Sequence, residues 1–213
     1  MSTDLAIFGG EPIRKEPFPA WPRITEEMKR SLIHTFEEEE WGVGSKTITL
    51  FNEQFATMQD AEYCLSIHSG TSAIWICLKA AGIEAGDEVI LPSYTFIATA
   101  TAVVLANAVP VFADIDKKTA NLDPTSVEKL ITKKTKAIIP VHTAGAPADM
   151  KAFLDISKKY NIPIIEDAAQ GHGSMIENKK IGAIGLGGIF SFQTSKKMSS
   201  GEGGALSLIH ISE

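Results

Sequence analysis

Cysteine is scarce in this chain of 213 residues, which has only Cys64 and Cys77, both within apolar runs. Two such thiols favour a reducing compartment over a disulfide-stabilised scaffold. The chain also lacks a basic block, and its net charge of −6 argues against nucleic acid or an anionic membrane as a partner. It shows neither a signal peptide at its start nor an apolar run long enough to span a membrane. We therefore expect a cytoplasmic protein.

The composition is that of an ordinary globular protein, with 44% hydrophobic and 22% charged residues. The length fits one α/β domain preceded by an arm. Residues 1–24 contain Pro12, Pro17, Pro19 and Pro22, and we expect them to form the extended N-terminal arm.

Short buried strands and amphipathic helices are expected to alternate along the rest of the chain. This order predicts an α/β fold with a mostly parallel sheet and helices on both faces. In such sheets ligands bind where the strands end, so residues directly after strands are the first candidates for a site. Helices are predicted over 25–40, 47–60, 71–81, 96–106, from 123 or 125 onward, and 150–160, and strands over 88–91, 109–113, 136–141, 162–166 and 188–192.

A Ser-Gly-Thr turn opens the helix expected over 71–81. Gly70 would let a ligand approach the backbone, and the N–H groups and hydroxyls of Thr71 and Ser72 suit a phosphate. Simple capping of the helix by Ser69 or Thr71 is the better explanation of this segment taken alone.

Pro92-Ser93-Tyr94-Thr95-Phe96 directly follows the strand expected over 88–91. An aromatic ring at this point can stack on a flat cofactor, although packing in the core or at a rim is the commoner role. The segment itself does not decide between Tyr94 and Phe96.

Residues 164–172 join a buried strand to two carboxylates, a turn of small residues, an amide and an imidazole. Asp167 at the end of the strand can hold a ring nitrogen protonated by charge pairing, which makes a pyridine ring an electron sink. A helix-capping aspartate is the alternative. For His172 a structural hydrogen bond is favoured over catalysis, and no second His or Cys gives a metal-ligating spacing, so we expect no metal.

Lys196 and Lys197 lie in a segment of aromatic, hydroxyl and glycine residues, 190–204. A lysine held against aromatic and apolar groups can be kept neutral by desolvation and can then attack an aldehyde. Two adjacent lysines also fit a solvated basic loop. The four segments together are therefore much more specific than any one of them.

Taken together, the four segments resemble the DegT/DnrJ/StrS family of aminotransferases, which use pyridoxal phosphate (PLP) and share the aspartate aminotransferase fold (fold type I). The motifs stand in the family's order: Ser-Gly-Thr, Pro-Ser-Tyr-Thr-Phe, Glu-Asp-Ala-Ala-Gln, and Ser-Phe-Gln-x-x-Lys-x-Met-x-x-Gly-Glu-Gly-Gly. The resemblance implies a PLP-binding large domain over residues 25–205, lacking a small C-terminal domain. It also implies a homodimer when the protein is full length.

By motif position, Lys196 resembles the lysine that carries PLP as a Schiff base, five residues before the first Gly of Gly-Glu-Gly-Gly. Lys197 is then a bystander. Asp167 resembles the partner of the pyridinium nitrogen, and Gln170 the residue near the phenolic oxygen. The resemblance further assigns phosphate contacts to Thr71, Ser72 and Ser191, close approach to Gly70, and ring stacking to Phe96 rather than Tyr94.

The implied reaction moves an amino group from glutamate or glutamine to a keto-sugar or keto-cyclitol through the Lys196 Schiff base, with Lys196 as general base and acid. The Gly-Gly-Glu-Pro opening and residues 192–204 resemble the branch that acts on inosose-type cyclitols and aminohydroxybenzoate precursors. Residues 143–147 depart from the family pattern, because relatives usually carry a Gln before the Pro.

A PLP-dependent sugar dehydratase on the same scaffold is the main alternative, but in that relative a His replaces the Schiff-base lysine. The intact set of Lys196, Asp167 and Gln170 argues against a catalytically inactive relative. A generic phosphate-binding module would leave three of the four segments unexplained.

Residues 206–213 do not resemble the family, and they match a translation of the transposon-end adapter used in sequencing libraries. We therefore expect a truncated reading frame with an artificial tail, a genuine C-terminal strand being the alternative. The missing part would hold substrate contacts and residues that complete the partner's phosphate site. This fragment alone is accordingly expected to bind PLP poorly and to be inactive or nearly so.

Overall fold

The computed structural model describes residues 5–39 and 42–209. The chain divides into two compact units, Met1–Glu38 and Glu39–Glu213. The first contains a 3-10 turn, η1 (Ala6–Phe8), and helix α1 (Glu26–Glu37). Thr25 caps α1, because its hydroxyl accepts a hydrogen bond from Met28 N at 3.2 Å. No residue of α1 is buried, and the expected helix end at Glu40 lies outside the described residues.

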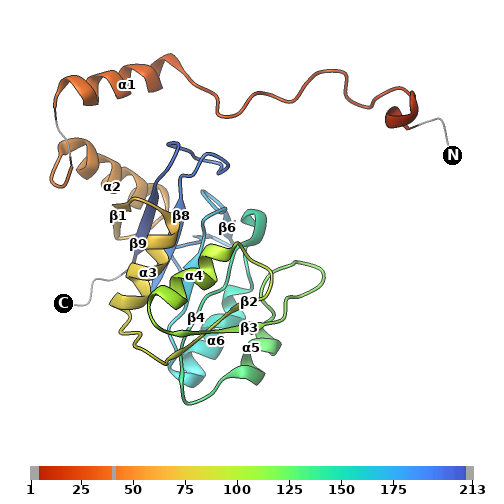
Figure 1. The fold of residues 1–213 in the computed structure, drawn as a ribbon, viewed down its shortest axis with the longest axis vertical. Coiled ribbons are helices and arrows are strands. Elements are labelled where there is room, and N and C mark those ends of the chain that lie inside the picture. The colour runs from red at the N-terminus through yellow and green to blue at the C-terminus, as the bar shows by residue number, and fades with distance from the viewer. Residues whose placement is uncertain (1–4, 40–41, 210–213) are drawn as a thin grey trace. The chain divides into compact units, whose positions relative to one another are not determined.

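A sheet forms the centre of the second unit (Figure 1). It consists of a three-stranded part with the order β3-β2-β4 and a four-stranded part with the order β1-β9-β8-β5. Parallel bridges from Ile138 to Ile164 and from Val141 to Asp167 connect the two parts. All pairs are parallel except those of β9, which runs antiparallel to β1 and β8, so the prediction of a mostly parallel sheet is confirmed. The strands are β1 (Tyr63–Ile67), β2 (Glu88–Pro92), β3 (Val109–Ala113), β4 (Thr135–Ile138), β5 (Ile165–Asp167), β8 (Gly187–Ser191) and β9 (Gly204–Leu208).

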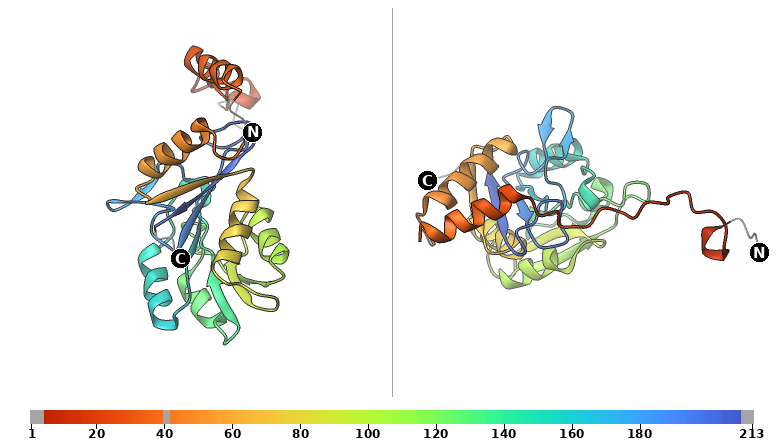
Figure 2. Two further views of the ribbon diagram at one scale, coloured as in Figure 1. Left: turned by 90° about the vertical axis from the view of Figure 1, so that its left-hand side faces the viewer. Right: turned by 90° about the horizontal axis from the view of Figure 1, so that it is seen from above.

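Helices cover both faces of this sheet, as the alternation of buried residues along its strands requires. In β2, Val89 and Leu91 pack with residues of α3 and α4, whereas Ile90 packs with residues of α5 and α6. On the same side as α6, α2 packs through Phe55 against Phe190 of β8 (Figure 2, left). The helices are α2 (Lys46–Met58), α3 (Gly70–Ala80), α4 (Ile97–Leu105), α5 (Pro124–Leu130) and α6 (Met150–Tyr160).

Two strands and one hairpin are additions to the predicted elements. The edge strand β1 was not predicted, and its only buried residue is Cys64. A hairpin joins β6 (Met175–Ile176) to β7 (Lys179–Lys180). Among the described residues, no helix combines the length and apolar character needed to cross a bilayer.

The end of the chain enters the sheet through β9. Leu206 and Ser207 are buried there, although both belong to the segment expected to be an artificial tail. The sheet therefore continues past the expected domain boundary at residue 205. Residues 210–213 of that segment lie outside the described residues, and its origin stays a prediction.

Candidate active site

A cavity of about 570 Å³ opens where β5 and β8 end and where α3 and α4 begin. This is the edge of the sheet at which an α/β fold binds ligands. It collects residues from all four segments that the sequence singled out. Of the predicted site residues, the cavity is lined by Gly70, Thr71, Phe96, Asp167, Gln170, Ser191 and Lys196, whereas Ser72 is not among its lining residues.

One corner of the cavity combines the N-terminus of α3 with the end of β8. Ser69 caps α3, and its hydroxyl accepts the N–H of Ser72 at 3.2 Å. The expectation of an unused N–H at Ser72 is therefore wrong, and capping by Ser69 is confirmed. Gly70 and Thr71 occupy the first two helical positions, where no carbonyl of a preceding turn is available to their N–H groups.

Two glycines allow the close approach that forms this corner. A Cβ at Gly70 would lie 3.0 Å from Ser191 Cβ, and one at Gly204 would lie 2.4 Å from the carbonyl carbon of Ser69. Gly204 ends the Gly-Glu-Gly-Gly motif. An N-terminal turn of a helix beside a serine hydroxyl suits a phosphate group.

Asp167 is the last residue of β5, and its side chain is held from two directions. Oδ2 accepts a hydrogen bond from the Thr99 hydroxyl at 2.8 Å, and Oδ1 accepts one from Ala169 N at 3.2 Å. The alternative of a helix-capping aspartate is wrong, because turns follow Asp167 instead of a helix. The carboxylate is thus a buried, oriented acceptor at the cavity wall.

Gln170 connects the cavity to the segment in which the sequence departs from the family pattern. Its Oε1 accepts the N–H of Ala144 at 2.8 Å. Ala144 lies in the short 3-10 turn η2 (Thr143–Gly145) and has a left-handed φ of 54°. Because a backbone N–H fixes which amide atom is the oxygen, Nε2 is the donor that Gln170 can offer to a ligand.

Lys196 is half-buried at the cavity, and its Nζ lies 5.9 Å from the centroid of the Phe96 ring. Phe96 lines the cavity, whereas Tyr94 is not among its lining residues. Lys197 is exposed and its Nζ lies against Gly145. Both lysines border a neighbouring cavity of about 310 Å³, but Lys196 is the one that also faces the main cavity.

His172 lies beside this site in an aromatic environment. Its ring packs at 5.4 Å from the centroids of both Phe190 and Phe192. No hydrogen bond to either ring nitrogen meets the usual distance and angle limits among the described residues, but the Ser191 backbone lies close enough to act on the ring as a weak partner and to raise its pKa, so the predicted structural hydrogen bond stays a prediction. Burial lowers the pKa of His172 to about 4, and the charges of Lys196 and Lys197 act in the same direction.

The structure adds site residues that the sequence did not single out. Thr95, Thr99, Ser195 and Glu202 line the cavity with the predicted residues. Thr95 lies just before α4 and Thr99 lies in its first turn, four residues apart in the segment that follows β2. That position is a signal that could have identified them, since side chains four apart share one helical face.

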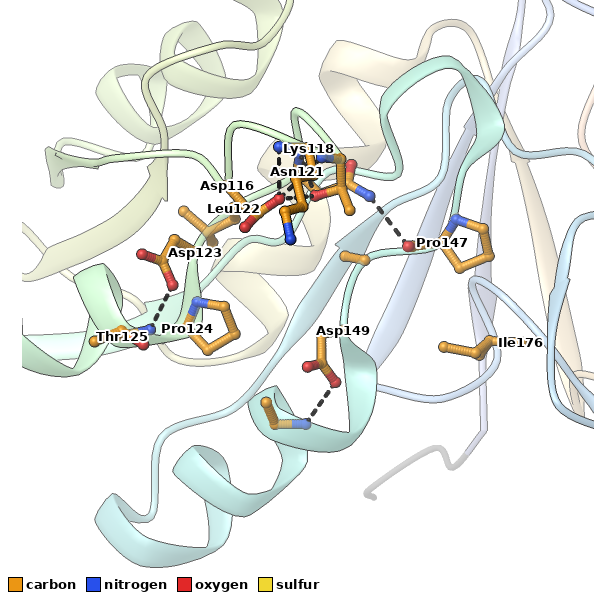
Figure 3. A pocket seen from close by; sticks show the side chains of 13 residues that line it. Asp116, Lys118, Asn121, Leu122, Asp123, Pro124, Thr125, Pro147, Asp149 and Ile176 are labelled. Carbon is orange, nitrogen blue, oxygen red and sulfur yellow. Dashed lines mark hydrogen bonds between the residues drawn. The ribbon is translucent and has the colours of Figure 1, made fainter.

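A second cavity, of about 620 Å³, lies away from these residues (Figure 3). Its carboxylates already have partners within the chain. Asp123 caps α5, Asp149 caps α6, and Asp116 accepts hydrogen bonds from the N–H groups of Lys118 and Thr119. No group of three or more His, Cys, Asp or Glu among the described residues is arranged to hold a metal ion. The cavity of about 570 Å³ is therefore the better candidate for a site.

Comparison with known proteins shows the family of the chain. The DegT/DnrJ/EryC1/StrS aminotransferase family matches residues 22–209. The chain belongs to this family. It is 41% identical over 210 residues to the L-glutamine:2-deoxy-scyllo-inosose aminotransferase of Streptomyces kanamyceticus, covering 96% of this chain and 49% of that relative.

Solved structures of other proteins share the fold of this DegT/DnrJ/EryC1/StrS family member. 3-Amino-5-hydroxybenzoic acid synthase superposes with a TM-score of 0.88 at 38% identity, over 90% of this chain and 50% of that chain. NtdA from Bacillus subtilis, solved with bound cofactor PMP, gives a TM-score of 0.83 at 30% identity, over 99% and 49%. The chain thus spans about half the length of the relatives that it matches.

Proposed function

We propose that this chain is the cofactor-binding part of a PLP-dependent aminotransferase that moves an amino group from glutamine or glutamate to a keto-cyclitol or keto-sugar. The observation that carries the proposal is the convergence of Lys196, Asp167 and Gln170 with the corner at Gly70 in one cavity. The family membership and the names of its relatives support the reaction class and the amino donor.

The residues present fit PLP in charge and in hydrogen-bonding character. The N-terminus of α3 and the Ser191 hydroxyl would hold the phosphate. Asp167 would face the ring nitrogen, since a buried carboxylate pairs with a protonated nitrogen. Gln170 Nε2 would donate to the phenolic oxygen, and the exposed ring of Phe96 would pack on the face of the pyridine ring.

Bound PLP would supply an aldehyde that accepts an amino group and a ring that draws electrons away from the carbon being deprotonated. Lys196 would be the residue of this chain that bonds to the cofactor and transfers the proton. Its Nζ would hold the cofactor between turnovers, then accept the proton from the α-carbon of the amino donor and return it on the cofactor side. Asp167 would keep the ring nitrogen protonated throughout, so its carboxylate must stay ionised and oriented.

The acceptor is proposed to be a cyclitol or sugar ketone because of the named relatives. The relative from Streptomyces kanamyceticus is an L-glutamine:2-deoxy-scyllo-inosose aminotransferase. Within the present chain, Ala144 of η2 borders the neighbouring cavity of about 310 Å³ beside Gln170, where the sequence departs from the family pattern. Assembly as a homodimer and location in the cytoplasm are further parts of this proposal.

The test is an amino-transfer assay on the longest natural protein that contains these residues, purified with PLP. A panel of keto-cyclitols and keto-sugars is offered with glutamine or glutamate, and the aminated product is measured. We expect turnover with at least one keto-cyclitol, loss of turnover in Lys196→Ala, and retention in the neighbouring control Lys197→Ala. Turnover that survives Lys196→Ala would contradict the proposal.

A further inference from the structure

Thr99 contacts the candidate site from within α4. Its side chain is fully buried at 0% exposure, and its hydroxyl donates to Asp167 Oδ2 at 2.8 Å. The two residues are 68 positions apart in the sequence, so this contact exists only in the folded chain. A buried hydroxyl needs a partner, and here the partner is the carboxylate proposed to face the cofactor.

A second hydroxyl fixes the direction of this hydrogen bond. Thr95 Oγ1 and Thr99 Oγ1 lie 2.8 Å apart. A carboxylate can only accept, so the single hydroxyl proton of Thr99 goes to Asp167. The contact between the threonines must then run from Thr95 to Thr99. The result is a directed chain of two hydroxyls that ends on Asp167 Oδ2.

The other carboxylate oxygen is held independently. Asp167 Oδ1 accepts the N–H of Ala169 at 3.2 Å. One donor on each oxygen restricts rotation of the carboxyl group about its bond to Cβ. Each oxygen also keeps a lone pair for a further partner. Thr95, Thr99 and Asp167 all line the cavity of about 570 Å³, so the oriented group is open to a ligand.

We propose that Thr99 is a positioning residue for Asp167: with Thr95 behind it, it holds the carboxylate in the orientation that pairs with the ring nitrogen of PLP. This inference rests on the proposed function. A purely structural link between α4 and β5 would use the same hydrogen bond. The two roles differ in outcome, because only the positioning role changes how strongly the ring nitrogen of a bound cofactor is protonated.

The experiment compares Thr99→Val, Thr99→Ser and Thr101→Val in the longest natural protein that contains these residues. Valine keeps the shape of threonine and removes the hydroxyl, whereas serine keeps the hydroxyl. Thr101 is the matched control, because it lies on the exposed side of α4 and its hydroxyl donates to the Ile97 carbonyl of the same helix. The readouts are the dissociation constant of PLP and the ¹⁵N chemical shift of ring-labelled PLP in the complex.

In Thr99→Val we expect PLP to bind about tenfold more weakly or worse, the effect of losing one hydrogen bond to a charged group. The ¹⁵N resonance should move toward that of an unprotonated ring. Thr99→Ser should restore both values, and Thr101→Val should match the wild type. A Thr99→Val complex with wild-type affinity and ¹⁵N shift would overturn the inference and leave the proposed function intact.

Two further outcomes keep the test decisive. If the wild-type protein bound no PLP, the proposed function and this inference would both be overturned. If Thr99→Val did not fold, Thr95→Val would take its place, since it removes the donor behind Thr99 and leaves the contact to Asp167. A smaller shift of the ¹⁵N resonance in the same direction would then support the inference, and an unchanged resonance would overturn it.

Discussion

Replacing Glu166 by glutamine is expected to destabilise the second unit by about 4 kcal/mol, although the two side chains have nearly the same shape. Glu166 is fully buried beside Asp167. Its Oε1 accepts the N–H groups of Ile184 at 2.8 Å and Gly185 at 2.7 Å. Its Oε2 accepts the N–H of Gly182 at 2.8 Å and also contacts a histidine. The carboxylate therefore ties the loop between β7 and β8 to the end of β5.

The histidine is His142, whose Nε2 lies 3.1 Å from Glu166 Oε2. Its other ring nitrogen, Nδ1, accepts the N–H of Ala148 at 3.0 Å and so carries no proton. The ring proton must be on Nε2, which makes His142 a fourth donor to the carboxylate. Among the residues that the structure describes, four donors and no acceptor contact this carboxylate.

A glutamine at position 166 cannot satisfy these donors in either orientation. Its NH₂ group would replace one oxygen and would face two N–H donors. Each buried donor left without an acceptor costs about 1–3 kcal/mol, so the expected loss is about 2–6 kcal/mol. A domain of this size loses about 2–4 °C of melting temperature for each kcal/mol, so a loss near 4 kcal/mol corresponds to about 8–16 °C.

Thermal and urea unfolding at pH 7, followed by circular dichroism, measure this loss. Glu128→Gln is the matched control, because Glu128 is an exposed carboxylate that contacts Lys159 at 2.6 Å, and an exposed pair adds little stability. If Glu166→Gln were as stable as Glu128→Gln, the assignment of Glu166 as the common acceptor would be refuted.

Two further substitutions test other parts of the site. Since burial holds the pKa of His172 near 4, below its ordinary value of 6.5, its contribution is present above pH 6.5 and is lost as the pH falls toward 4. That contribution is about 3 kcal/mol, and His172→Leu should flatten the acid side of the stability profile measured by urea unfolding between pH 4 and 7. Gly204→Ala should displace the backbone of Ser69 and weaken phosphate binding in a titration with PLP. Gly201→Ala, which has open space around its Cβ, should strain its own turn and leave that affinity nearly unchanged.

Local patterns were sufficient for the elements that bury one face. Helix α6 has the predicted bounds, because Asp149 caps its start and apolar residues recur with a helical period through Ile156. The two strands that were not among the predicted elements, β1 and β9, lack such a pattern in the sequence. Strand β1 lies at an edge with mostly exposed side chains, and β9 begins at a glycine. Their pairing joins residues 63–67 to residues 204–208, which no local signal records.

In the candidate site, too, motifs in the sequence predict some of the residues, whereas contacts between distant segments appear only in the folded structure. Motif order predicts that Lys196 and Asp167 belong to one site, and both line the same cavity because residues that follow parallel strands meet at one edge of the sheet. The bonds of Thr99 to Asp167 and of Ala144 to Gln170 depend on side-chain orientation across the fold. The Ser72 N–H is used in capping by Ser69, and the phosphate contact of Ser72 stays a prediction, because capping and phosphate binding use the same kind of N–H group.

Borohydride reduction followed by peptide mass mapping tests the central claim most directly. The longest natural protein that contains these residues is saturated with PLP, reduced and digested, and the modified lysine is located. The predicted result is a phosphopyridoxyl label on Lys196, absent in Lys196→Ala and retained in Lys197→Ala. A label on Lys197, or a label that persists in Lys196→Ala, would contradict the account.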